Sequence, residues 1–269
     1  MHACLNLRRM MLKATISLLA FLPANPTSAQ RSALSLEEVL QHLESNSRLY
    51  EATAPDFFCD EHVISIKSSL HVRERTVTDS IFRVERRTSG PIKRLIESRE
   101  IKAVNGHPST KNELPGPITL QGVFSGGLDV VSTAQTSCMR YAFNPRNSDP
   151  STKYYAIEFA TLPDVQRRPR CSFSEDTNGH ILIDKGTMQV ERMDLVTPHH
   201  AFLPGLEGIW RISITYGSVD LDSRRFRMPQ TIASTLTWSD SGGLTVWSFD
   251  AMYSNYHKFG VTAYILPVQ

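Results

Sequence analysis

Four reactive side chains stand together at Cys59-Asp60-Glu61-His62. A thiol beside an imidazole has the composition of a Cys–His nucleophile pair, in which the histidine takes the thiol proton. The surrounding residues, however, predict a strand over 57–66, where neighbouring side chains point to opposite faces. Cys59 and Glu61 then share one face and His62 lies on the other, so the segment does not favour this chemistry. If Glu61 faces inward, it needs a partner such as an arginine, or water, because an unpaired buried carboxylate is costly.

Two serines stand in surroundings that resemble those of hydrolase nucleophiles. Ser241 lies in Ser239-Asp-Ser-Gly-Gly243, which is similar to a stretch of chymotrypsin-like proteases, and Ser125 lies in Gly122-Val-Phe-Ser-Gly. No Ala-Ala-His-Cys-like segment supplies the histidine base that Ser241 would need, and Ser125 stands one position late for a nucleophile elbow. Serine, aspartate and glycine are also ordinary turn residues. We therefore expect a hairpin turn at Ser241 and no enzymatic activity, with a serine hydrolase as the remote alternative.

Metal, cofactor and nucleotide binding have little support. His199 and His200 are adjacent, and adjacent side chains on an extended segment diverge, so the pair is poorly placed to hold one ion. The other histidines beyond residue 29 lack the His-x-x-x-His spacing, and the cysteines lack the Cys-x-x-Cys spacing, of zinc sites. No glycine-rich loop follows a strand and opens a helix. We predict no metal ion and no cofactor.

The first 29 residues predict an export signal. Three basic residues are followed by an apolar run over 14–22, and small residues precede a cleavage point between Ala29 and Gln30. No later segment reaches the roughly 18–20 continuous apolar residues of a membrane-spanning helix. The prediction is a cleaved signal peptide at 1–29 and a single β-rich domain at 30–269, located in the periplasm or outside the cell.

Cleavage also changes the charge of the chain. It removes three of the 29 basic residues and none of the 27 acidic ones, so the formal net charge moves from +2 to −1. A nucleic-acid partner is therefore not expected. Two basic clusters remain, at 167–170 and 224–227. Each could meet an anionic surface, but a solvated loop or strand edge is the simpler interpretation.

Three cysteines remain beyond the signal: Cys59, Cys138 and Cys171. In an oxidising compartment an odd number suggests one disulfide and one free thiol, and the sequence permits three pairings. We favour Cys138–Cys171, because these two flank a proline-rich excursion that a covalent link would restrain. Closing a loop of that length stabilises the chain by roughly 3–4 kcal/mol in the chain-entropy model. Cys59 is then a buried thiol.

The pattern of apolar residues predicts one helix followed by many strands. Ser35-Leu-Glu-Glu38 has the composition of a capping box, and an apolar face with helical spacing follows, so a helix over 35–50 is expected. Beyond it the period changes to two, with a bulge expected near Arg192. A second short helix is expected within 122–132. Strands are predicted at 57–66, 80–87, 92–103, 137–143, 153–161, 171–175, 179–184, 188–195, 209–216, 230–239 and 244–252.

Turn signals separate these strands and set the fold class. They stand at 105–106, 178–179, 184–186 and 241–243. Short turns join antiparallel neighbours. The prediction is a mainly β, α+β fold, in which an antiparallel meander forms an unclosed β-barrel or half-barrel with the helix packed on its concave face.

Aromatic residues crowd the C-terminal quarter. On strands such residues usually fill a core, and in an incompletely closed barrel they can instead line a cavity for a hydrophobic ligand. A filled core is the simpler expectation. The residues concerned are Trp210, Trp238, Trp247, Phe249, Tyr253, Tyr256, Phe259 and Tyr264.

Three segments resemble a family of uncharacterised exported bacterial proteins. They are Pro55-Asp-Phe-Phe-Cys-Asp-Glu61, Gly122-Val-Phe-Ser-Gly-Gly-Leu128 and the late stretch ending in Tyr256-His-Lys-Phe259. In architecture the chain resembles the periplasmic lipoprotein-carrier superfamily of LolA- and LolB-like proteins and their sigma-factor-regulator relatives. That resemblance implies an unclosed barrel with helices at its mouth, and it transfers no binding residue to this chain.

Two functional hypotheses follow from this expectation. In the first, the half-barrel holds a lipid, an acyl chain or a lipidated partner between its sheet and the helix, and movement of the helix controls entry. In the second, the chain is an interaction module of the cell envelope that binds no small ligand. The sequence identifies neither the ligand-lining residues nor the oligomeric state.

Overall fold

The structure is a computed structural model, and the predicted signal peptide and its cleavage point lie outside the residues that it describes. No described helix is long and apolar enough to cross a membrane. The described residues are 34–89, 92–110, 113–120, 122–126, 131, 135, 137–144, 152–165, 171 and 173–259.

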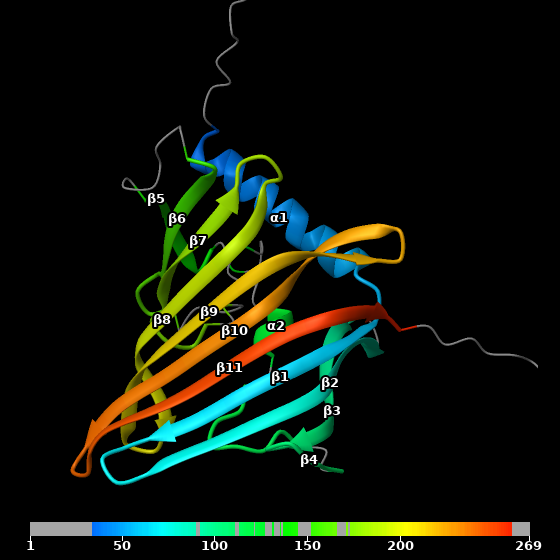
Figure 1. Cartoon of the computed structure of the whole chain (residues 1–269). Helices are drawn as coiled ribbons and strands as arrows, with labels where there is room; N and C mark the ends of the chain where they lie inside the picture. The colour runs from blue at the N-terminus through cyan, green and yellow to red at the C-terminus, as the bar shows by residue number, and fades with distance from the viewer. Residues whose placement is uncertain are drawn as a thin grey trace, which may run out of the picture. The chain divides into compact units, whose positions relative to one another are not determined.

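These residues form one antiparallel sheet with a long helix, α1, and a short helix, α2 (Figure 1). The elements are α1 (Leu36–Thr53), β1 (Phe57–Ser68), β2 (Arg73–Ser89), β3 (Ile92–Val104), β4 (His107–Pro108), α2 (Val123–Gly126), β5 (Met139–Phe143), β6 (Tyr154–Thr161), β7 (Asn178–Asp184), β8 (Gln189–Leu203), β9 (Leu206–Leu221), β10 (Arg224–Asp240) and β11 (Gly243–Lys258).

The sheet is open, with 11 strands in the order β4-β3-β2-β1-β11-β10-β9-β8-β7-β6-β5. Every neighbouring pair is consecutive in the chain except β1 and β11, which join the first long strand to the last. Their register places Ile64 opposite Asp250 and Ser68 opposite Val246. Because β4 and β5 lie at opposite edges and do not pair, the sheet does not close into a barrel. The predicted fold class, a mainly β half-barrel with one long helix, is confirmed.

Helix α1 begins at the predicted capping box. The Glu38 amide donates to the Ser35 hydroxyl at 3.2 Å, and the Ser35 amide donates to the Glu38 carboxylate at 2.7 Å. The helix runs three residues beyond the predicted end. At this end the Arg86 guanidinium donates to the carbonyls of Ala52 and Ala54, which have no partner within the helix.

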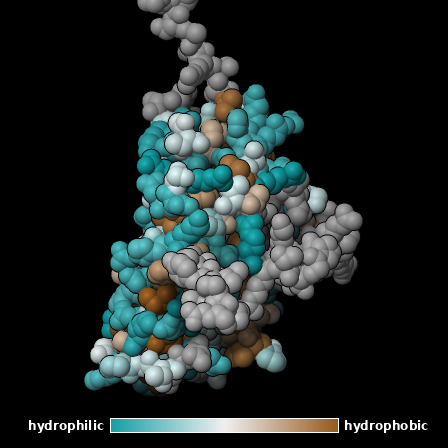
Figure 2. All heavy atoms as spheres, turned by 90° about the vertical axis from the view of Figure 1, so that its right-hand side faces the viewer, coloured by the Kyte–Doolittle hydropathy of each residue, from teal (hydrophilic) through white to brown (hydrophobic). Residues whose placement is uncertain are grey.

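The inner face of the sheet packs against α1, α2 and a loop. Val39, Leu43 and Ser47 on one face of α1 are buried, as a helical spacing of four residues requires. Farther along the sheet the inner face carries small polar groups. There the Ser65 hydroxyl binds the backbone of Ile118 in the loop 113–120, with O–O and N–O distances of 2.9 and 3.1 Å. The coloured part of the face in Figure 2, which is the right-hand side of Figure 1, is mainly hydrophilic, with hydrophobic residues in small separate groups.

Most of the local predictions match the structure. The register between β7 and β8 skips Glu191, since Leu182 pairs with Arg192 and Ile183 pairs with Val190, which is the bulge expected near Arg192. The turns at 105–106, 184–186 and 241–243 are also present, and α2 lies in the range predicted for a second helix.

Two predictions next to the disulfide were wrong. The described residues of 171–175 form no strand, and Asn178-Gly179 begins β7 instead of forming a turn. The reason lies in packing: a Cβ on Gly179 would stand 1.9 Å from the carbonyl oxygen of Asp194. Gly179 lets β7 approach β8 closely, and this packing requirement outweighs the tendency of Asn-Gly to form a turn.

The disulfide is the one that we favoured from the sequence. Cys138 and Cys171 form a disulfide with a Cα–Cα distance of 5.9 Å, and Cys59 is a buried free thiol. Burial, followed by the nearby Glu61 carboxylate, raises the pKa of the Cys59 thiol. The thiol is therefore a poor nucleophile in the folded protein.

Candidate functional site

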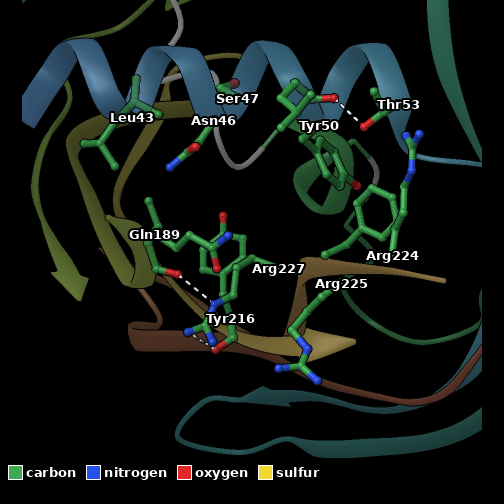
Figure 3. Close-up of a pocket in the computed structure, with 14 residues that line it drawn as sticks. Leu43, Asn46, Ser47, Tyr50, Thr53, Gln189, Tyr216, Arg224, Arg225 and Arg227 are labelled. Atoms are coloured by element: carbon green, nitrogen blue, oxygen red, sulfur yellow. Dashed lines mark hydrogen bonds between the residues drawn. The ribbon is translucent and has the colours of Figure 1, made fainter. Parts of the chain in front are cut away.

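A cavity of about 510 Å3 lies between α1 and the sheet, next to the start of β8 and the β9–β10 hairpin (Figure 3). Small-molecule sites typically have volumes of about 300–1,000 Å3. The cavity is lined by Leu43, Asn46, Ser47, Leu49, Tyr50, Thr53, Val131, Gln189, Val190, Tyr216, Arg224, Arg225, Phe226 and Arg227.

The deep part of the cavity is largely apolar. Leu43 on α1, Val190 on β8 and Phe226 on β10 belong to the buried core and also line the cavity. Ser47 is buried one helical turn beyond Leu43 on the same face of α1. Because a serine stands where the pattern Val39–Leu43 would continue with a large apolar residue, the helix leaves space above the sheet at this position.

Two polar side chains of α1 point from the helix toward the cavity in Figure 3. The Asn46 amide donates to the carbonyl of Met188 at 2.7 Å, which ties the helix to the β7–β8 turn. The Tyr50 hydroxyl lies close to the cavity, and burial raises the pKa of this phenol. The phenol is therefore neutral at physiological pH and can donate a hydrogen bond to a ligand.

Three arginines form one side of the cavity, and two of them are held by carboxylates. Arg227 pairs with Glu191, the extra residue of the β8 bulge, and donates to the Tyr216 carbonyl at 3.1 Å. Arg225 pairs with Asp220 at 2.9 Å across the β9–β10 hairpin. The hydrogen bonds from Arg225 lower the pKa of the exposed Asp220.

The side chain of Arg224 is exposed and has no hydrogen bond or ion pair within the described part of the chain. In Figure 3 its side chain extends from β10 along the cavity toward Thr53, near the end of α1. The cavity thus has an apolar interior and one uncompensated positive charge at its edge. This composition suits an elongated apolar molecule with a polar or anionic end.

A second polar cluster lies in the core and does not contact the cavity. Arg99 on β3 donates to both carboxylate oxygens of Glu61 on β1, at 2.8–3.1 Å, and the Ser80 hydroxyl donates to the same carboxylate at 2.6 Å. The Arg99 guanidinium also lies over the Phe82 ring, 4.7 Å from its centroid. The predicted arginine partner of Glu61 is thus confirmed. A fully paired buried cluster of this kind has a structural role.

The other candidate residues from the sequence do not converge on one site. Cys59 is buried whereas His62 is half-buried on the other face and binds Asp79 at 2.7 Å, as the alternation predicted. His199 and His200 contact different carboxylates, those of Glu207 and Glu175. No group of metal-ligating side chains occurs among the described residues.

The two candidate serines also lie in different elements of the structure. Ser241 lies in the turn between β10 and β11, as predicted, and Ser125 lies in α2. The basic cluster at 167–170 lies outside the described residues.

The C-terminal aromatic residues mainly fill the core, as the simpler expectation held. Phe249, Tyr253 and Trp238 are buried, and Tyr256 packs on the same cluster. Tyr264 lies outside the described residues. The aromatic residues of the cavity come instead from α1, β9 and β10. The cluster at 224–227, interpreted from the sequence as a strand edge, is the part of the site that sequence reasoning missed.

The fold resembles those of three solved structures. A LolA-superfamily protein from Nitrosomonas europaea aligns with a TM-score of 0.34 and 11% identity, covering 86% of this chain and 96% of the other. A putative outer membrane lipoprotein-sorting protein domain from Vibrio parahaemolyticus gives 0.40 and 9%, covering 82% and 92%. A DUF1329 family protein from Desulfovibrio piger gives 0.37 and 10%, covering 84% and 94%.

No protein-family model and no curated protein sequence matches the chain.

Proposed function

We propose that the protein is an exported, non-enzymatic binding protein that holds the acyl chain of a lipid or of a lipidated partner in the cavity beneath α1. The observation that supports this proposal is the cavity itself, which has a volume of about 510 Å3 between the helix and the sheet and a largely apolar deep part. A neutral phenol and an arginine without a partner in the described chain stand at its edge, where a polar head would lie.

The volume of the cavity sets the size of the ligand. At about 30 Å3 for a group of the size of water or a methylene, about 17 such groups would fill it. One long acyl chain therefore fits better than two. Each buried methylene contributes about 0.8 kcal/mol, so affinity should rise with chain length until the cavity is full.

Entry to the cavity would require α1 to move. The described polar contacts of α1 and its preceding residue with β6–β8 include the Asn46–Met188 hydrogen bond and a hydrogen bond of 3.4 Å from the Leu34 amide to the Tyr155 hydroxyl. These contacts are few compared with the ladders between strands. Opening of the helix is thus less costly than opening of the sheet.

Titration with a fluorescent fatty acid tests the proposal. The variant Ser47→Phe adds a ring inside the cavity, and Ser45→Phe makes the same change on an exposed position of the same helix. We expect saturable binding by the wild type and by Ser45→Phe, and binding at least tenfold weaker in Ser47→Phe. Equal binding by the two variants, at equal thermal stability, would reject the cavity as the site.

The second candidate function is a protein-interaction module of the envelope that binds no small ligand. Strand β5 stands at one edge of the described sheet, and addition of an extended peptide to an edge strand is a common mode of recognition. Crosslinking in whole cells separates the two functions. A protein partner that is captured equally by wild type and Ser47→Phe, together with no fatty-acid uptake, would favour the interaction module.

A further inference from the structure

Three hairpins of the sheet end side by side, at the end of β10 that is remote from the cavity (Figure 1, cyan, yellow and orange tips). They are the hairpins β1–β2, β8–β9 and β10–β11, and their strands are neighbours in the sheet. The register places Lys67 opposite Trp247, and Leu236 opposite both Trp247 and Trp210. The tips therefore project from one edge of the molecule as a row.

This row carries exposed apolar side chains that the core does not explain. Of the nine large hydrophobic residues that are exposed in the described chain, five lie at or within a few residues of the turns of these hairpins, and they are between 38% and 75% exposed. A cluster of exposed apolar side chains on the surface of a globular protein marks an interaction site. We call this group the apolar tip; it consists of Leu70, Val72, Leu203, Ile209 and Leu244.

The β1–β2 hairpin of the apolar tip is positively charged, whereas the other two hairpins contain the acidic residues Glu207 and Asp240 near their turns. Residues 67–75 contain Lys67, Arg73 and Arg75 against one carboxylate, Glu74. Arg73 and Arg75 are exposed and have no ion pair within the described chain. Basic side chains beside apolar ones favour the surface of an anionic bilayer, because the cations meet the headgroups while the apolar groups enter the boundary of the acyl chains.

We propose that the apolar tip docks the protein on an anionic membrane surface. The shape of the apolar tip favours a bilayer as the partner, because its three turns project separately and each can enter the headgroup region of a membrane. The cavity would then be held away from the bilayer: from Arg227 to Asp240 along β10 the distance is about 40 Å at about 3.3 Å per residue. This docking does not depend on the cavity binding a lipid.

The chain supplies its own reporters for a test. Its three tryptophans, Trp210, Trp238 and Trp247, lie on β9, β10 and β11 in the half of the sheet next to the apolar tip. The test mixes the purified protein with vesicles of phosphatidylcholine and phosphatidylglycerol, or of phosphatidylcholine alone. Binding is measured by co-sedimentation, and brominated lipids report contact by quenching tryptophan fluorescence.

The decisive variant is Leu70→Ser/Leu244→Ser, and the matched control is Met252→Ser. Met252 is 54% exposed, which is close to the 58% of Leu244, but it lies in the middle of β11. We expect the double variant to partition onto the anionic vesicles on the order of 10- to 100-fold more weakly, and the control to bind like the wild type. Arg73→Gln/Arg75→Gln should weaken binding to the anionic vesicles and reduce its sensitivity to salt.

Two results would overturn the proposal. One is a double variant that binds like Met252→Ser, and the other is a wild type that binds neither vesicle, whether it stays a monomer or forms a dimer that Leu70→Ser/Leu244→Ser dissociates. Such a dimer would assign the apolar tip to a second copy of the chain. Because Ser47→Phe leaves the tip intact, it should keep vesicle binding even where it loses fatty-acid uptake, which separates this proposal from the function of the cavity.

Discussion

Replacement of Arg99 by methionine should destabilise the protein by about 3–5 kcal/mol, because it leaves the buried Glu61 carboxylate without its charge partner. Arg99 supplies three of the hydrogen bonds to that carboxylate, and the Ser80 hydroxyl supplies another. The side chain of Glu61 is fully buried and that of Arg99 is 8% exposed, so water cannot replace the lost contacts. At about 2–4 °C per kcal/mol for a chain of this size, the midpoint of thermal unfolding should fall by about 6–20 °C.

Urea unfolding followed by tryptophan fluorescence measures this loss, and Arg83→Met provides the matched control. Arg83 pairs with Glu100 on the neighbouring strand, but both side chains are partly exposed, so its loss should cost less than about 1 kcal/mol. The double variant Glu61→Gln/Arg99→Met removes the buried charge as well and should recover at least about 2 kcal/mol. The reasoning is refuted if Arg99→Met costs no more than Arg83→Met, or if the double variant is no more stable than Arg99→Met.

Three further changes test other parts of the fold. Cys138→Ser/Cys171→Ser should lower the free energy of unfolding by about 2–5 kcal/mol in urea titrations. A thiol assay on a wild-type chain that lacks residues 1–29 should find one free thiol, Cys59, that reacts after denaturation but not before. Gly179→Ala should lower the thermal midpoint, since its Cβ would meet a backbone carbonyl at 1.9 Å; an unchanged midpoint would contradict this packing. Asp184→Asn should destabilise the protein at neutral pH, because the hydrogen bond from Lys153 lowers the pKa of Asp184 in the folded state. The stabilisation that Asp184 provides is therefore complete above the ordinary pKa of 3.8 and is lost as the pH falls through the pKa of the folded state. The difference in thermal midpoint between this variant and the wild type should therefore decrease in acid. A difference that stays constant with pH would contradict a lowered pKa of Asp184 in the folded state.

The sequence predicts those elements whose signal is local. The capping box at Ser35 and the alternation along β9 and β10 place the helix and several strands, because each depends on residues within a few positions. The first part of β2 was missed for a physical reason. Its inward positions Thr76, Thr78 and Ser80 are polar, so no apolar alternation marks the strand. The loop 113–120 lies next to this part of the sheet, since a Cβ on Gly116 would stand 3.5 Å from the Cβ of Thr76, and the sequence does not reveal this packing.

The cavity depends on long-range packing and was therefore beyond local reasoning. It forms where Ser47 on α1 faces the β9–β10 hairpin, which is remote in sequence. No periodicity connects these segments. In contrast, the sequence predicts that Glu61 has an arginine partner, because a buried carboxylate without a partner is costly. The sequence does not show which arginine it is, and the structure identifies Arg99.

The pairing of β1 with β11 also escapes the sequence, since no turn joins them. This pairing brings the β1–β2 and β10–β11 hairpins to one edge. Two of the exposed leucines of the apolar tip, Leu70 and Leu244, lie on these two hairpins and appear in the sequence as unrelated turn residues.

Native mass spectrometry of the protein, purified from cells without detergent and compared with a delipidated sample, tests the central claim most directly. The account predicts a mass excess of one lipid or fatty acid per chain that delipidation removes, and that Ser45→Phe retains but Ser47→Phe lacks. A wild type with no adduct in either sample, or an adduct that survives unchanged in Ser47→Phe, would contradict the claim that the cavity beneath α1 holds an acyl chain.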